Sequence, residues 1–375
     1  MRKIKLLAFM CAMFMAATPA AMAAETIKLG VAGAHSGNLA GYGQGTLNAA
    51  HILVDQVNAA GGVAGGKMIE IVQQDDQCKP ELASTAASRL ISENVNLVIG
   101  HICTGATQAA LPLYTESKVV AISPSSTAPG LTQSGNNPTF FRTIASDDDQ
   151  ARIAVMCLED VVKVKKVAIL HDKGEYGRGY ADFVQEFLKI NNKVEVVLFE
   201  GITSGAADFA PIIQKVRSSG AEALVFGGYD PDGAKLASQL QRRRIDIPLI
   251  GPDGLRVESY IRLAGKAAEN TYASGTRDVS NNPLYKKAMQ DHMDKYGTPP
   301  PAQFYMQGYA ATQAAINAIN KAGGTDDTAK IMEILRTEYV DTPLGKVRFD
   351  SKGDAEGVGF ALFKVENGKF VQISE

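Results

Sequence analysis

The chain has 375 residues, of which 38 are basic and 40 are acidic, so its formal net charge is −2. This length is typical of two domains. The nearly balanced, slightly acidic charge argues against binding to nucleic acid or to an anionic membrane surface.

The first 23 residues have the pattern of an export signal. A basic start is followed by the apolar run 6–17 and by the small-x-small cleavage site Ala21-Met22-Ala23. The apolar run is too short to span a bilayer comfortably, and no lipobox-like cysteine follows it. We therefore expect a signal peptide over 1–23 and an exported, periplasmic product without stable membrane insertion. Its remaining 35 basic and 40 acidic residues give a net charge of −5.

Strand and helix patterns then alternate along most of the chain, which predicts an α/β fold. Two halves of similar size follow one another, at about 24–145 and 146–276. The first has predicted strands at 27–32, 67–72, 97–99 and 119–122, and helices at 44–59, 80–93 and from 106. The second has predicted strands at 166–170, 194–199, 223–226 and 247–250, and helices at 146–161, 180–189, 209–218 and 232–243. Helices at 284–296, 303–322 and 328–336 and short strands at 346–349, 359–363 and 370–372 complete the chain.

The stretch 97–129 contains two neighbouring strands that each end in a hydroxyl-rich loop. The first strand is followed by His101-Ile102-Cys103-Thr104-Gly105 and a helix, and the second by Ser123-Pro124-Ser125-Ser126-Thr127. Ligands of open α/β sheets bind outside the carboxyl ends of the strands, where helix N-termini offer free N–H groups to an anion. We expect this stretch to hold the carboxylate of a small ligand.

Three cysteines remain after the predicted signal peptide, and export makes a disulfide plausible. Cys78 and Cys103 each follow an apolar strand, so their loops would meet if the two strands were neighbours in a parallel sheet. Cys157 lies on an apolar helix face and is interpreted as a buried free thiol.

Motifs for catalysis are lacking in this sequence. It has no HExxH, GxSxG, P-loop or CxxC, and the glycine-rich run 41–45 lacks the GxGxxG spacing of a dinucleotide site. His101 and His171 follow strands and could line a cleft, but hydrogen-bonding roles at a strand end are the more common use of such residues. We expect no cofactor and no metal.

Several strand-end loops instead carry groups that together suit an α-amino acid. Hydroxyl groups suit a carboxylate, an acidic side chain suits an ammonium group, and aromatic rings suit an apolar tail. Two lobes with facing strand ends would enclose these groups in a cleft. The groups are Tyr42, Thr104, Ser125, Thr127, Tyr176, Tyr229, Asp253 and Phe304.

The chain resembles the periplasmic leucine/isoleucine/valine-binding proteins of ABC importers over nearly all of its mature length. The segments that carry the resemblance include 31–37, 61–63, 75–80, 98–103, 127–129, 171–177, 227–229 and 251–254. The resemblance implies two doubly wound parallel-sheet lobes joined by three hinge crossovers near Ser146, Thr276 and Lys352. The lobes would comprise 24–145 plus 277–352 and 146–276 plus 353–375. It also implies a Cys78–Cys103 bridge.

The resemblance further assigns roles to individual residues. The ligand carboxylate would meet Thr104 and Thr127, the backbone carbonyl contact would fall on Ser125, and the ammonium partner would be Asp253. Tyr42, Tyr176, Tyr229 and Phe304 would line the pocket, and Ile102 and Ser126 complete the expected ligand-binding set.

Three of these positions differ from the family's best-known member, which has serine, alanine and glutamate where this chain has Thr104, Ser125 and Asp253. Aspartate is one methylene shorter than glutamate, so its carboxylate reaches about 1.5 Å less far. A difference of one methylene in how a ligand fits its site changes the binding free energy by about 1–3 kcal/mol. This is enough to reorder the preference among small amino acids.

The sequence is compatible with three functions. The first is a monomeric, non-enzymatic protein that delivers a branched-chain or other small aliphatic L-amino acid to an inner-membrane ABC permease. The second is a receptor of the same fold that senses an amide or another small polar ligand. The third, which the missing motifs disfavour, is a secreted α/β enzyme.

Overall fold

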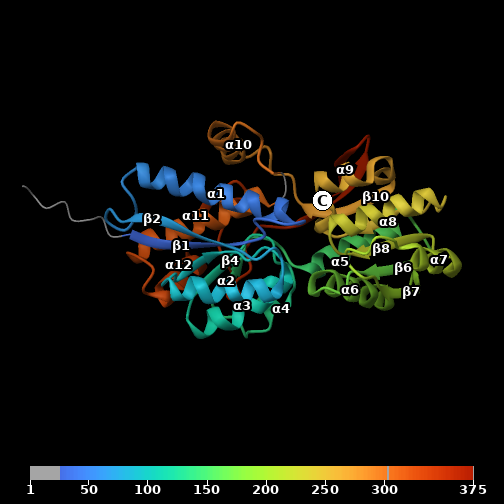
Figure 1. The fold of residues 1–375 in the computed structure, drawn as a ribbon, viewed down its shortest axis with the longest axis horizontal. Coiled ribbons are helices and arrows are strands. Elements are labelled where there is room, and N and C mark those ends of the chain that lie inside the picture. The colour runs from blue at the N-terminus through green and yellow to red at the C-terminus, as the bar shows by residue number, and fades with distance from the viewer. Residues whose placement is uncertain (1–25, 302–303, 375) are drawn as a thin grey trace, which may run out of the picture.

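The computed structural model describes residues 26–301 and 304–374, and the predicted signal peptide lies outside them. These residues form two lobes that lie side by side along the long axis of the molecule (Figure 1). In both described ranges, every helix is too short or too polar to cross a membrane.

The first lobe is built on a five-stranded parallel sheet in the order β2-β1-β3-β4-β5. Its strands are β1 (Thr26–Gly33), β2 (Met68–Asp75), β3 (Leu97–Ile99), β4 (Val120–Ser123) and β5 (Phe140–Arg142), with the hairpin β11 (Val340–Thr342) and β12 (Gly345–Val347) beside them. Its helices are α1 (Ala40–Ala59), α2 (Pro80–Ser92), α3 (Thr104–Glu116), α4 (Gly130–Gln133), α10 (Pro283–Tyr296), α11 (Tyr305–Ala322) and α12 (Thr328–Thr337).

The second lobe has a seven-stranded sheet in the order β14-β13-β10-β9-β8-β6-β7. Its strands are β6 (Lys166–His171), β7 (Glu195–Gly201), β8 (Ala223–Gly227), β9 (Leu249–Gly251), β10 (Thr271–Thr276), β13 (Phe360–Glu366) and β14 (Lys369–Ser374), the last two being antiparallel. Its helices are α5 (Asp147–Met156), α6 (Glu175–Asn191), α7 (Ala210–Ser219), α8 (Asp230–Arg242) and α9 (Glu258–Ala264), with short helical turns η1 (Cys157–Val161), η2 (Asp253–Leu255) and η3 (Gly265–Asn270).

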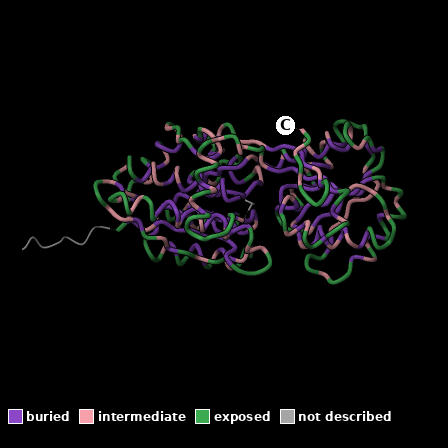
Figure 2. Tube along the Cα trace, turned by 90° about the horizontal axis from the view of Figure 1, so that it is seen from above, coloured by how far each residue is buried: buried purple, intermediate pink, exposed green. Residues whose placement is uncertain are grey.

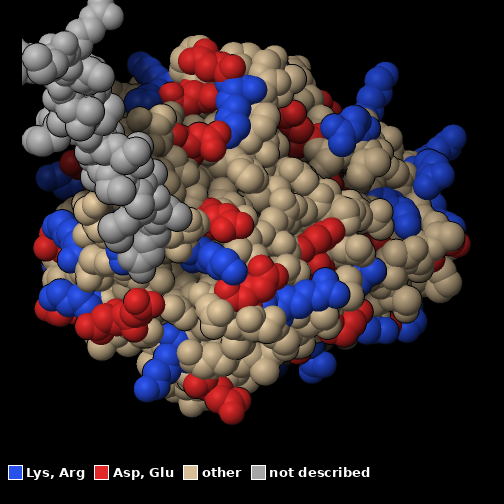
Figure 3. All heavy atoms as spheres, turned by 60° about the vertical axis from the view of Figure 1, so that its left-hand side comes forward, with Lys and Arg blue, Asp and Glu red and all other residues tan. Residues whose placement is uncertain are grey.

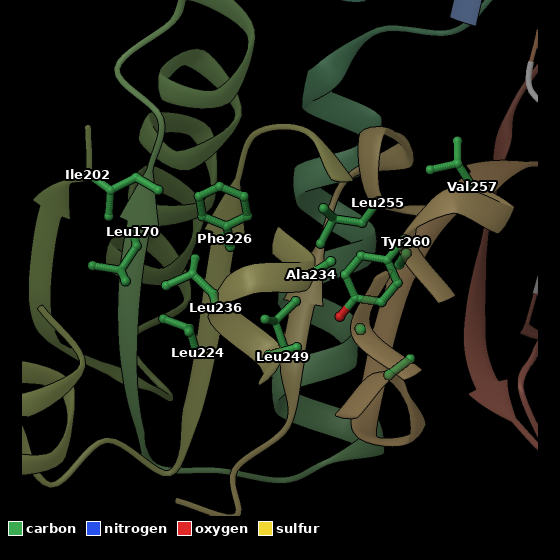
Figure 4. Packing of buried hydrophobic residues seen from close by; sticks show 14 of the residues in the cluster. Leu170, Ile202, Leu224, Phe226, Ala234, Leu236, Leu249, Leu255, Val257 and Tyr260 are labelled. Carbon is green, nitrogen blue, oxygen red and sulfur yellow. The ribbon is translucent and has the colours of Figure 1, made fainter. Parts of the chain in front are cut away.

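Both sheets are covered by helices on their two faces, and the interior strands β3, β8 and β9 are accordingly apolar and fully buried. In the first lobe Leu29 and Val31 of β1 pack in one core with α1, α11 and α12, whereas Ala32 points to the opposite core with α2 and α3. In the second lobe Leu224 of β8 and Tyr260 of α9 pack in the core shown in Figure 4. Buried chain is concentrated inside each lobe (Figure 2). The predicted α/β class with two lobes is confirmed.

The chain passes between the lobes three times, from β5 to α5, from β10 to α10, and from β12 to β13. The third passage keeps contact with the first lobe up to Ala355, whose N–H donates to the carbonyl of Arg142, and β13 begins at Phe360. All three passages lie beside one another at the junction, where residues of each line one small pocket. Such an arrangement is typical of hinge closure between lobes.

Helix α6 begins five residues earlier than the predicted start at Tyr180. The two glycines of its first turns read as loop residues in the sequence. In the structure a Cβ on Gly177 would lie 2.5 Å from the carbonyl oxygen of Gly227, so glycine is required where this helix approaches the end of β8. The early start places Tyr176 in the first turn of the helix.

The disulfide between Cys78 and Cys103 is confirmed, with Cα atoms 5.3 Å apart. The premise that their strands are neighbours is wrong, because β1 lies between β2 and β3. The bridge therefore spans the carboxyl end of β1. Cys157 is free and buried, as expected.

Replacing both Cys78 and Cys103 by serine should lower the free energy of unfolding by about 3 kcal/mol, because the bridge closes a loop of 25 residues in the unfolded chain. Urea denaturation with and without reductant measures this. Reductant should shift the midpoint of the wild-type protein and leave that of the double variant unchanged. An unchanged wild-type midpoint would show that the bridge contributes no stability.

Candidate ligand-binding site between the lobes

A small cavity lies between the two lobes and is lined by residues of both. The first lobe contributes Tyr42, Ile102, Cys103, Thr104, Ser125 and Phe304, and the second contributes Tyr176, Tyr229, Asp253 and Gly254. Eight of the ten residues that the sequence singled out are thus brought together, although they come from seven separate segments of the chain.

The first-lobe wall of the cavity is built at the end of β3. Gly100, with φ of +127°, turns the chain, and a Cβ there would lie 2.0 Å from the carbonyl oxygen of Ala32. Helix α3 starts directly afterwards at Thr104, so the backbone N–H groups of its first turn have no partner within the helix. The Thr104 hydroxyl is buried and has no hydrogen-bond partner among the described residues. An unpaired buried hydroxyl is costly, which favours a ligand that hydrogen-bonds to it.

The loop after β4 braces this wall. Ser125 Oγ donates to the carbonyl of Ile102 at 2.7 Å, and Ser126 Oγ lies 2.5 Å from Thr107 Oγ1. Ser126 and Thr127 do not line the cavity. Thr127 is buried behind the wall, where its carbonyl accepts from the N–H of Asp147 at 2.9 Å. Ligand contacts by Ser126 and Thr127 therefore stay predictions.

His101 supports the same wall from behind. Its Nδ1 lies 2.6 Å from Asp76 Oδ2 and its Nε2 lies 3.0 Å from Tyr114 Oη, and the imidazole is buried. Both ring nitrogens are thus engaged away from the cavity, as expected for a hydrogen-bonding histidine at a strand end. In the two described ranges no group of three or more His, Cys, Asp or Glu side chains could hold a metal ion.

Four aromatic rings form the apolar part of the cavity. Tyr42 lies 5.7 Å from Tyr229 and 5.9 Å from Phe304, centroid to centroid, and Tyr176 lies 5.0 Å from Tyr229. Rings at these distances in edge or tilted arrangements are mutually attractive. The rings come from both lobes, so they form a continuous apolar surface only when the lobes meet.

Asp253 lies opposite the first-lobe wall, in the short turn η2 after β9. Its Oδ1 accepts hydrogen bonds from Tyr176 Oη and from Gln150 Nε2, the latter at 3.1 Å. Tyr176 therefore does more than line the pocket with its ring. Burial raises the pKa of Tyr176 well above its ordinary value, so its hydroxyl keeps the proton that it donates.

A second acid, Asp147, is buried near Asp253. Burial raises the pKa of Asp147 to about 8, with the Asp253 charge as a further cause, and burial raises the pKa of Asp253 to about 6. Two carboxyl groups this close do not both ionise readily. Both shifts disfavour a double negative charge in the empty site, and a cation bound beside the pair would offset them.

Tyr42 also joins the lobes directly. Its hydroxyl lies 2.7 Å from Asp230 Oδ1 and 2.8 Å from the carbonyl oxygen of Gly254, both in the second lobe. Ser259 Oγ donates to the other oxygen of Asp230 at 2.6 Å. The sequence reasoning missed Asp230. Its place directly after the strand-end loop 227–229 was the available signal.

Tyr42→Phe should weaken ligand binding about tenfold, because a hydrogen bond to a buried carboxylate that forms only between closed lobes contributes about 1.5 kcal/mol. Calorimetry and dissociation rates measure the effect, which should fall mainly on the dissociation rate. Tyr260→Phe is the matched control, since that hydroxyl meets Thr271 Oγ1 at 2.6 Å inside one lobe. Equal effects of both substitutions would rule out a specific role for the contact between lobes.

The fold, the crossovers and the cavity define a two-lobed binding protein. The model of the periplasmic binding protein family matches residues 26–369, and the chain belongs to this family.

Individual relatives are similar over most of their length. The leucine-, isoleucine-, valine-, threonine- and alanine-binding protein of Pseudomonas aeruginosa is 34% identical over 92% of this chain and 91% of its own. The Leu/Ile/Val-binding protein of Escherichia coli K12 is 34% identical over 91% of each chain. The crystal structure of the branched-chain amino acid transporter substrate-binding protein LivJ of Streptococcus pneumoniae, in complex with isoleucine, is 27% identical and aligns with a TM-score of 0.81, covering 93% of this chain and 100% of that one.

Proposed function

We propose that this protein binds a branched-chain or other small aliphatic L-amino acid between its lobes. The observation that carries the proposal is the arrangement of the cavity. The unpaired hydroxyl of Thr104 and the start of α3 lie on one lobe, and the carboxylate of Asp253 lies on the other. An α-amino acid carries the complementary charges on one carbon atom, and the four aromatic rings suit its aliphatic side chain.

The biological role that we propose is delivery of this ligand to an inner-membrane ABC permease. The relatives named above are binding proteins, and one is described as a transporter substrate-binding protein. Closing the lobes would bury the ligand and present to the permease a surface that is absent while the lobes are open.

We infer that the protein is exported to the periplasm after removal of residues 1–23. We also infer that it needs no cofactor and acts without catalysis.

The surface charges are compatible with this role. On the face shown in Figure 3, Lys and Arg side chains are interspersed with Asp and Glu rather than gathered by sign. This face lacks the basic stripe that attracts nucleic acid.

Calorimetry with a panel of L-amino acids, their amides, hydroxy acids and sugars tests the proposal. We expect leucine, isoleucine or valine to bind more tightly than about 10 μM, a free energy of about −7 kcal/mol. A hydroxy acid of the same skeleton lacks the ammonium group and should bind much more weakly. If an amide binds and no α-amino acid does, the protein is a receptor for an amide instead. Turnover of a bound ligand would favour an enzyme.

Affinity for an amino acid should fall as the pH is lowered from 8 through 6, most steeply below 6. The ammonium group favours the ionised forms of Asp253 and Asp147, whose pKa values are about 6 and about 8 in the empty site, so protonation competes with binding. Tyr176, Tyr229 and Arg256 also face Asp253, but they do not titrate in this range. Calorimetry between pH 5 and 8.5 measures the dependence. An affinity independent of pH would contradict the placement of the ammonium group.

A further inference from the structure

Gln150 lies next to the proposed ammonium site without lining the cavity. It is in the first turn of α5, just after the first crossover between the lobes, and its side chain is completely buried. Its amide nitrogen donates to Asp147 Oδ1 at 2.9 Å and to Asp253 Oδ1 at 3.1 Å. Its amide oxygen accepts from the backbone N–H of Asp253 at 2.8 Å and from Ser274 Oγ at 2.5 Å. An amide group has two N–H donors and two lone pairs, so this set uses its full capacity.

The geometry of these bonds constrains Asp253 in a particular way. Gln150 binds both the backbone N–H and the side-chain carboxylate of the same residue, so it fixes the carboxylate relative to its own backbone. Tyr176 Oη donates to the same oxygen, Oδ1, from α6. Aspartate has only two side-chain torsions, and donors from two separate helices hold it in one rotamer.

The same side chain also links the two walls of the cavity. The backbone N–H of Asp147 donates to the carbonyl of Thr127 in the first lobe, and Asp147 Oδ1 accepts from Gln150. The loop that braces the first-lobe wall is therefore connected to Asp253 through Asp147 and Gln150. The hydrogen-bond chain that orients Asp253 thus begins in the first lobe.

We propose that Gln150 is a positioning residue for ammonium recognition, which orients the Asp253 carboxylate toward the ligand from outside the cavity. The inference rests on the proposed function, because it requires an ammonium group at Asp253. Gln150 itself touches no ligand. Gln150 holds the Asp253 carboxylate in the binding orientation before the ligand arrives, so the Asp253 side chain loses no rotamer freedom on binding.

A double-mutant cycle tests this role. Gln150→Met removes the amide and keeps the size of the side chain, Asp253→Asn removes the charge, and the double variant carries both. L-leucine is one probe, and 4-methylpentanoate, which has the same skeleton without the amino group, is the other. Gln239→Met is the matched control, since Gln239 is a buried glutamine of the same lobe whose amide oxygen accepts from the N–H of Phe209 at 3.0 Å.

We expect Gln150→Met to weaken L-leucine binding about five- to tenfold and to change the binding of 4-methylpentanoate less than twofold. In the Asp253→Asn background the same substitution should change L-leucine binding less than twofold. Gln239→Met should leave both affinities unchanged. If Gln150→Met does not fold, Ser274→Ala, which removes one bond to the Gln150 amide oxygen, should give the same pattern with a loss of about two- to threefold.

Equal weakening of both probes, or effects of Gln150→Met and Asp253→Asn that simply add, would overturn the inference and leave Gln150 with a structural role only. If Asp253→Asn weakens L-leucine binding and Gln150→Met does not, the inference fails while the proposed function stands. If Asp253→Asn itself has no effect, the ammonium group is placed wrongly and both fail.

Discussion

Asp253→Asn is expected to weaken the binding of a small aliphatic amino acid by about 2–3 kcal/mol, or about 30- to 150-fold. Asparagine keeps the shape of the side chain but removes the charge that faces the ammonium group. Asp253 is only 1% exposed, so the lost interaction is not replaced by solvent. Calorimetry on the folded variant gives the value.

Asp232→Asn provides the control for this substitution. Asp232 is also buried in the second lobe, where it accepts from Ser204 Oγ at 2.6 Å and from the N–H of Gly205 at 3.0 Å, but it does not line the cavity. Its substitution should affect stability and leave ligand affinity unchanged. Unchanged affinity in Asp253→Asn would mean that another group meets the ammonium, or that the ligand has none.

Arg142→Met is expected to lower the free energy of unfolding by about 3 kcal/mol. Arg142 is fully buried at the end of β5, and its Nε pairs with Asp354 Oδ1 at 2.6 Å. Its other nitrogens donate to the carbonyl of Ala128 and to the hydroxyl of Thr132, both at 3.0 Å. Removing the guanidinium group leaves these buried acceptors without a donor, which costs more than the lost packing.

Urea denaturation measures the effect of Arg142→Met. The control is Lys215→Met, which breaks an exposed ion pair with Glu200 of 2.7 Å and should cost less than about 0.5 kcal/mol. Since Arg142 ties the first and third passages between the lobes, we also expect slower or weaker closure in the variant. A loss of stability no larger than that of Lys215→Met would show that the buried pair contributes little.

The sequence predicted most of the apolar strands. Strands β1, β3, β6 and β8 each contain several Val, Ile or Leu residues, and their positions were correct to within a few residues. Strand β5 was missed although its residues are buried and two of them are Phe. Strand β10 was missed although it is central in its sheet. Its residues, Thr271 to Thr276, are mostly small or polar. A strand that is covered on both faces can be held in place by its neighbouring strands even when its residues have low β propensity.

The candidate site was predictable for residues that directly follow a strand. Thr104, Tyr229 and Asp253 each come at or just after a strand end, and the carboxyl edge of a parallel sheet brings such positions together. Gln150 could not be predicted in the same way, because it lies within a helix and is linked to the site through Asp147 and Asp253. Asp230 was missed although it directly follows the strand-end loop 227–229. Thr127 shows the opposite limit, since its position in a strand-end loop does not reveal that its side chain is buried behind the wall.

The central claim is that the carboxylate of an α-amino acid binds at Thr104 and the start of α3 while its ammonium group binds Asp253. A crystal structure of the protein grown with L-leucine tests this most directly. We predict the ligand in the cavity between closed lobes, with a carboxylate oxygen about 2.7 Å from Thr104 Oγ1 and the nitrogen about 2.8 Å from Asp253. Leucine in the reverse orientation, or an empty cavity at saturating leucine, would contradict the claim.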